Sequence, residues 1–231
     1  MTWRTEAEDA GRAAYPGEAC GLVAVVRGRE RFMPCRNVAT EPGEHFSIHP
    51  EDWAAAEDAG EVVAVVHSHP GQGPDPSDMD RAGCEASGLP WHIVGVPCLL
   101  WRTIAPEGYR APLVGREFAW RVQDCYSLIR DWFAEDRGVT LPDFPRARGD
   151  FERGVDHYGE HFAEAGFVEV HDEPRRGDVL LFRLAAKVPD HGAIYLGDDT
   201  ILHHMEGRLS TRDTWGGVFR ERTVKVLRYV A

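Results

Sequence analysis

Apolar and polar positions in the first half of the chain follow two kinds of pattern. Val62 to Val66 form a short, continuous apolar run, which is typical of a buried strand. Other stretches carry apolar residues three and four positions apart, which is typical of a helix packed on one face. The patterns predict helices over 5–15, 52–59 and 77–87, and strands over 20–26, 31–35, 61–67, 91–96 and 99–103. Strands alternating with helices in this way predict one sheet covered by helices.

The second half begins with the clearest helical stripe of the chain. Its apolar residues lie at positions i, i+3, i+4, i+7 and i+8 and therefore share one helix face: Cys125, Leu128, Ile129, Trp132 and Phe133. Strands are expected over 177–182, 190–197 and 201–204, and a further helix over 151–165. Residues 105–112 contain proline and glycine without any periodicity, as a linker does. We therefore expect an α+β protein with two domains, residues 1–112 and 113–231.

Composition narrows the class of protein and of partner. The 231 residues are 43% hydrophobic and carry a formal net charge of −12, so ordinary soluble cores are expected. A negative chain argues against nucleic-acid binding, which needs a basic surface. The amino terminus lacks the pattern of a signal peptide, and no apolar run of about 18 residues predicts a membrane span. We expect synthesis in the cytoplasm.

The predicted strand at 61–67 ends in the sequence His67-Ser-His69-Pro. Residues i and i+2 of a strand point to the same side, so the two imidazoles can bind one metal ion. Asp80 follows and offers a carboxylate oxygen. Two nitrogen ligands and one oxygen ligand, with a fourth position left for water, form the pattern of a catalytic zinc site. Glu18, upstream, is the candidate base for that water.

Ser77 and Asp80 have a second interpretation, as the cap and third-position carboxylate of a helix. A capping segment can still deliver Asp80 to a metal. The complete set, a glutamate, then a strand, then HSHP, then a serine and an aspartate, resembles the JAMM (MPN) metalloprotease family. The resemblance implies an α/β/α domain of the cytidine-deaminase-like type, with Zn²⁺ held by His67, His69 and Asp80. It also implies that Glu18 is the general base and that Ser77 is a hydrogen-bond donor to the developing oxyanion, in the cleavage of a peptide or isopeptide bond.

Cys125 stands at the start of its predicted helix, where the helix dipole favours a thiolate with a pKa below the ordinary value of about 8.5. The alternative is a buried structural cysteine, the common fate of this residue type and the one expected for Cys20, Cys35, Cys84 and Cys98. His191 opens one predicted strand, and His203 and His204 end the next. A tight turn between the strands can bring His191 beside His203, so that a base and its orienting partner lie near a thiol. His191 could equally be a surface residue, and His203 and His204 a pair at the edge of the core.

The DC pair at a helix start, the GDVLLF and HGAIYLG strands, and the histidine twelve residues after His191 resemble the NlpC-type papain-like cell-wall peptidases. The resemblance covers residues 113–231. It implies that Cys125 is the nucleophile, His191 the base and His203 the third, orienting residue. His204 competes for the third role, but strand alternation puts it on the opposite face.

Two further histidines, His157 and His161, stand four residues apart in the predicted helix over 151–165. That spacing suits a metal site on a helix, but no acidic base accompanies His157 as it does in an HExxH motif. We expect both histidines to be solvated surface residues.

A JAMM-like half followed by an NlpC-like half resembles the tail assembly proteins of lambda-like siphophages. That resemblance implies a hydrolase, a cysteine endopeptidase combined with a zinc metallopeptidase, located at the virion tail tip or baseplate. It implies peptidoglycan stem peptides as the substrate, in the host cell wall or periplasm, and other tail-tip proteins as partners. A processing protease or a structural tail-tip component, with only one site active, is the alternative.

Overall fold

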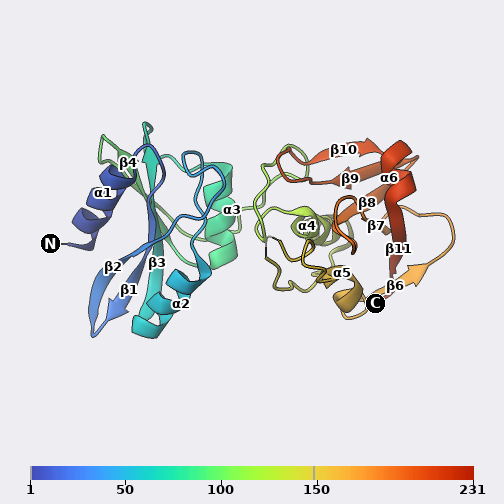
Figure 1. Cartoon of the computed structure of the whole chain (residues 1–231), viewed down its shortest axis with the longest axis horizontal. Helices are drawn as coiled ribbons and strands as arrows, with labels where there is room; N and C mark the ends of the chain where they lie inside the picture. Colours follow the sequence, from blue (N-terminus) through green and yellow to red (C-terminus); the bar gives the residue numbers. More distant parts are fainter. Residues whose placement is uncertain (1, 148) are drawn as a thin grey trace. The chain divides into compact units, whose positions relative to one another are not determined.

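The computed structural model describes residues 2–147 and 149–231. The chain divides into two compact units, Met1–Arg110 and Ala111–Ala231, each with its own sheet (Figure 1) and its own hydrophobic cores. This confirms the expected mixture of helices and strands in two domains. In the part of the chain that is described, no helix is long and apolar enough to cross a bilayer.

The first unit is built on a five-stranded sheet in the order β2-β1-β3-β4-β5. β3 and β4 are parallel and the other neighbours are antiparallel. Its elements are α1 (Trp3–Ala14), β1 (Cys20–Val26), β2 (Arg29–Cys35), α2 (Pro50–Ala59), β3 (Glu61–Pro70), α3 (Asp78–Ser87), β4 (Trp91–Val96) and β5 (Trp101–Ile104). The predicted elements of this half are thus present, with ends that differ by up to three residues.

Helices cover both faces of this sheet because the strands carry apolar side chains on both sides. Val23 and Val66 face one cluster, which includes Ala7 of α1. Their neighbours Leu22 and Val65 face the opposite cluster, which includes α2 and α3 residues. Since adjacent strand residues point to opposite faces, continuous apolar runs require a layer of helix on each side.

The second unit contains a six-stranded antiparallel sheet in the order β10-β9-β8-β7-β11-β6. Its elements are α4 (Cys125–Arg137), α5 (His157–His161), β6 (Phe167–Val170), β7 (Val179–Phe182), β8 (His191–Gly197), β9 (Thr200–His203), β10 (Thr211–Thr214), α6 (Gly217–Arg222) and β11 (Thr223–Tyr229). The predicted apolar stripe of α4 is buried in the main core of this unit, together with side chains from β7, β8 and β9.

The helix expected over residues 151–165 is wrong in its extent, because only α5 is helical there. Gly154 adopts a left-handed backbone with φ of 88°, which ends the preceding turn. Asp156 then caps a new turn by accepting a hydrogen bond from the N–H of Gly159 at 2.8 Å. A second turn signal inside an apparently helical pattern thus divides the segment. Strands β6, β10 and β11 and helix α6 are elements that the apolar pattern did not predict.

Candidate metal centre and candidate thiol site

β3 and α3 bring together the three side chains proposed as metal ligands. The Nε2 atoms of His67 and His69 lie 3.0 Å apart. Asp80 places Oδ1 at 3.1 Å from Nε2 of His67 and Oδ2 at 3.3 Å from Nε2 of His69. The three residues are buried, and among the described residues they form the one group of ligand-type side chains close enough to hold a metal ion.

The donor set fits a zinc ion. Ligand atoms around a tetrahedral zinc with bonds of about 2.0–2.1 Å are about 3.3 Å apart, close to the spacings found between His67, His69 and Asp80. Nδ1 of His69 lies 3.2 Å from the carbonyl oxygen of Gly73. Such a contact orients a ligating imidazole and fixes which nitrogen is free to bind.

Ser77 caps α3, as the capping interpretation predicted. Its Oγ accepts the backbone N–H of Asp80 at 3.0 Å, and the Asp80 carboxylate accepts the N–H of Ser77 at 2.8 Å. Burial opposes ionisation of Asp80, but hydrogen bonds from His67 and His69 outweigh it and hold the Asp80 pKa below its ordinary value. The cap therefore fixes an ionised carboxylate beside the two histidines.

Glu18 precedes β1 and is 7% exposed. Its neighbour Ala19 donates its backbone N–H to Oγ of Ser68, between the two histidines of β3, at 2.9 Å. Burial raises the pKa of Glu18 to about 7, with a partly opposing effect from His69. A carboxyl group with a pKa near neutral is suited to proton transfer.

The second site begins at the first turn of α4. Asp124 is the N-cap and accepts the N–H of Ser127 at 2.8 Å. Arg146 donates to both carboxylate oxygens of Asp124, from Nε at 2.7 Å and from Nη2 at 2.9 Å. Both side chains are buried, so this ion pair fixes the helix start that carries Cys125.

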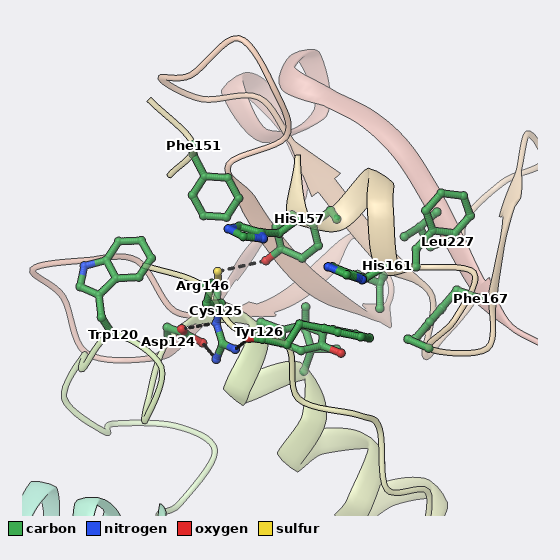
Figure 2. A pocket seen from close by; sticks show the side chains of 16 residues that line it. Trp120, Asp124, Cys125, Tyr126, Arg146, Phe151, His157, His161, Phe167 and Leu227 are labelled. Carbon is green, nitrogen blue, oxygen red and sulfur yellow. Dashed lines mark hydrogen bonds and ion pairs between the residues drawn. The ribbon is translucent and has the colours of Figure 1, made fainter. Parts of the chain in front are cut away.

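The sulfur of Cys125 lies 3.1 Å from the hydroxyl oxygen of Tyr158 on α5, the pair joined in Figure 2. Within the described residues, the sulfur makes no hydrogen bond to His191. Burial raises the pKa of Cys125 to about 11, and the charge of Asp124 adds to the effect. The expected lowering of this pKa is therefore wrong, because loss of hydration outweighs the helix dipole.

β8 and β9 place His191 beside His203, with Nε2 of the first 3.0 Å from Nδ1 of the second. Burial lowers the pKa of His191 to about 3, and His203 adds to the effect. His204 lies against the ring of Phe118, at 5.1 Å between centroids, and makes no side-chain hydrogen bond among the described residues. The geometry thus brings His203, and not His204, to His191.

His157 and His161 are not the solvated pair that the sequence suggested. Nε2 of His157 lies 2.7 Å from the carboxylate of Asp150. His161 stacks on Phe144, with ring centroids 4.1 Å apart. Both histidines line the pocket beside Cys125 instead (Figure 2).

The pocket beside Cys125 is lined mainly by apolar and aromatic side chains, as Figure 2 shows. The aromatic ones include Trp120, Tyr126, Phe144, Phe151, Phe162 and Phe167. Sequence reasoning missed Tyr158 and Arg146. They lie 33 and 22 residues away from the side chains they contact, and no local pattern marks them.

Comparison with known proteins identifies both halves. Residues 3–107 match the family of prokaryotic homologs of the JAB domain, and residues 115–228 match the NlpC/P60 family. A desampylase of Haloferax volcanii is 38% identical over an alignment of 74 positions, and the match covers 29% of this chain and 53% of that protein.

Two relatives cover nearly the whole chain. The tail tip assembly protein K of Escherichia phage N15 is 43% identical over 222 residues, covering 94% of this chain and 90% of the relative. The protein of the same name from Escherichia phage lambda is 38% identical over 185 residues, covering 80% and 90%. The chain belongs to the tail tip assembly protein K family of lambda-like phages, with a JAB/MPN-like domain followed by an NlpC/P60 domain.

Proposed function

We propose that this chain is a tail-tip peptidase whose second domain hydrolyses peptide bonds in the stem peptides of peptidoglycan. The observation that carries the proposal is the hydrogen bond between His191 and His203 beside the start of α4. Nε2 of His191 is occupied by His203, which leaves Nδ1 as the ring nitrogen available to the thiol of Cys125. A thiol, a base and a residue that orients the base are the components of a cysteine nucleophile.

In this mechanism Cys125 gives its proton to Nδ1 of His191 and its sulfur attacks the carbonyl carbon of the scissile bond. His191 then returns the proton to the leaving amine, and a thioester remains on the sulfur. Water, deprotonated by His191, hydrolyses the thioester and frees the thiol. His203 orients His191 throughout. The S–H hydrogen turns toward His191 before the first step, while the sulfur stays at hydrogen-bond distance from the Tyr158 hydroxyl.

We assign the first domain a zinc-dependent peptidase site of its own. His67, His69 and Asp80 would hold the ion, whose contribution when bound is Lewis acidity. Glu18 would take up a proton from the attacking water and later release it. Ser77 would donate a hydrogen bond from its hydroxyl to the substrate oxygen that gains negative charge. The raised pKa of Glu18 supports its role. Similarity to a desampylase favours an enzyme over a purely structural module, for a peptide or isopeptide substrate.

Membership of a tail tip family supports other tail-tip or baseplate proteins as partners, and action in the host wall or periplasm. Delivery by the tail would also explain how a chain with a net charge of −12 reaches an anionic wall, because transport then does not depend on electrostatic attraction.

A second candidate function, an assembly protease or a structural tail-tip protein in which only one site is active, is favoured by one observation. Cys125 is 7% exposed with a pKa raised to about 11. Such a thiol is protonated at neutral pH, whereas the nucleophile is the thiolate.

Digestion of purified peptidoglycan by the full-length chain distinguishes the two candidates. Mass spectrometry should reveal new amino and carboxyl ends on stem peptides, and we expect the cut between D-glutamate and the diamino acid. Cys125→Ala should abolish the cut, while Cys98→Ala, a change at an exposed cysteine, should not. Release of reducing sugar, or full activity in Cys125→Ala, would refute the proposal.

The same digestion tests the assignment of His203 as the residue that orients His191. His203→Ala should lower activity by less than Cys125→Ala does, because an orienting residue contributes less than the nucleophile. Loss of activity in His204→Ala with none in His203→Ala would transfer that role to His204.

A further inference from the structure

Tyr158 is the side chain that touches the sulfur of Cys125, and the roles assigned so far leave it without a function. We propose that Tyr158 is a further catalytic residue, whose hydroxyl donates a hydrogen bond to the sulfur and stabilises the negative charge left there when the proton passes to His191. In that step the S–H bond breaks, the proton moves to Nδ1 of His191 and the sulfur keeps the electron pair. This inference rests on the proposed function of the thiol site.

Burial makes the donor important. Cys125 is 7% exposed and Tyr158 is 9% exposed, so little water is available to solvate a thiolate at this position. An anion in such a place depends on donors supplied by the protein. The Oη–Sγ distance of 3.1 Å is a hydrogen-bond distance, and a bond to an ionised acceptor is stronger than one to a neutral acceptor.

Tyr158 can act only as a donor toward an anion. Burial raises the pKa of Tyr158 well above its ordinary value, and Cys125 adds to the effect. The phenol therefore stays protonated while the thiol ionises. The hydrogen bond with Tyr158 is one of the contacts that lower the pKa of Cys125 against the larger effect of burial.

The other groups that act on the sulfur of Cys125 do not replace the hydrogen bond from Tyr158. The charge of Asp124 opposes ionisation of Cys125, and the charge of Arg146 favours it. Although those two form a buried ion pair with each other, Asp124 acts on the sulfur more strongly than Arg146 does, so the pair leaves a net effect that opposes the thiolate. The backbone of Gly192 is the other hydrogen-bonding group that favours the thiolate. Tyr158 and Gly192 thus approach the sulfur from two different elements, α5 and β8.

The structure around Tyr158 holds the hydroxyl in this place. Its ring stacks on Phe151, with centroids 6.0 Å apart and planes at 15°. A Cβ added to Gly192 would lie 2.9 Å from Oη of Tyr158, so the hydroxyl occupies space that glycine leaves open on β8.

The test is the rate at which iodoacetamide alkylates Cys125 in the full-length chain at pH 8–9, followed by mass spectrometry of the Cys125 peptide. Tyr158→Phe removes the donor and keeps the ring that covers the sulfur. Loss of one hydrogen bond to a charged group raises the thiol pKa by about one unit. The thiolate fraction then falls about tenfold, and the higher nucleophilicity of the more basic thiolate recovers about threefold. Alkylation should therefore be about threefold slower.

Tyr195→Phe is the matched control. Tyr195 is also 9% exposed, and its hydroxyl accepts the N–H of Asp199 in a different cluster of the same unit. This variant should alkylate at the rate of the parent. Gly192→Ala is a second perturbation that keeps the phenol but pushes it from the sulfur, and it should also slow alkylation.

Unchanged or faster alkylation in Tyr158→Phe would overturn the proposal and leave Tyr158 as a cover over the thiol. Alkylation requires no peptide substrate, so this outcome is independent of whether the chain digests peptidoglycan. If Tyr158→Phe slows alkylation but the parent digests no wall, the donor role stands and the proposed function fails.

Discussion

Replacing Arg146 by methionine tests whether the start of α4 depends on a buried charge. The guanidinium binds both oxygens of the Asp124 carboxylate at 2.7 and 2.9 Å, and also reaches Oγ of Ser127 at 3.0 Å. Asp124 is 1% exposed and Arg146 is 7% exposed. Methionine retains much of the apolar stem but leaves the carboxylate buried without its partner.

The expected cost follows from that geometry. Removing one partner of a buried ion pair costs about 3–5 kcal/mol. A unit of this size has a stability of about 5–15 kcal/mol, so the variant should fold but be much weaker. With a slope of about 1.5 kcal/mol per molar urea, the unfolding midpoint should fall by about 2–3 M.

The assay is urea unfolding of residues 111–231, monitored by circular dichroism. This unit has its own hydrophobic cores, and we expect it to fold alone. A second variant, Asp124→Asn with Arg146→Met, keeps a side-chain oxygen to cap the helix but removes the unpaired negative charge of the buried carboxylate. It should be more stable than Arg146→Met alone. Equal or lower stability in the double variant would refute the reasoning that the uncompensated charge is the cost.

Three further outcomes are expected. The chain should hold about one zinc ion, measured by elemental analysis; His69→Ala should lose it and Glu18→Gln should retain it, and loss in Glu18→Gln would make that carboxylate a ligand. The pKa of His191 is about 3 in the folded state against 6.5 for the free side chain, so the unfolded chain binds a proton more readily. The stabilising contribution of neutral His191 is therefore full above pH 6.5 and falls as the pH drops toward 3, by about 2 kcal/mol at pH 5. Equal urea-unfolding midpoints at pH 7 and pH 5 would contradict this. A limiting dose of iodoacetamide at neutral pH should modify the exposed Cys98 before Cys125, and the reverse order in a peptide map would show an activated thiol.

The clustering of His67, His69 and Asp80 could be predicted from the local sequence because local geometry fixes it. Alternation along a strand puts His67 and His69 on one side, and the Ser77 cap fixes Asp80 at the third helical position. Likewise, Asp124 caps α4 and places Cys125 in its first turn. In each case the controlling residues lie within a few positions of one another.

Only the tertiary structure decided which distant side chains meet at the thiol site and how Cys125 ionises. Tyr158 reaches Cys125 across 33 residues and Arg146 reaches Asp124 across 22, and no periodicity encodes such pairs. The ionisation of Cys125 depends on how completely α5, β8 and the pocket side chains exclude water. The position of Cys125 at a helix start predicts a lowered thiol pKa, but burial reverses the direction of the shift. Desolvation arises from all the elements packed around the sulfur together, so it cannot be predicted from the helix alone.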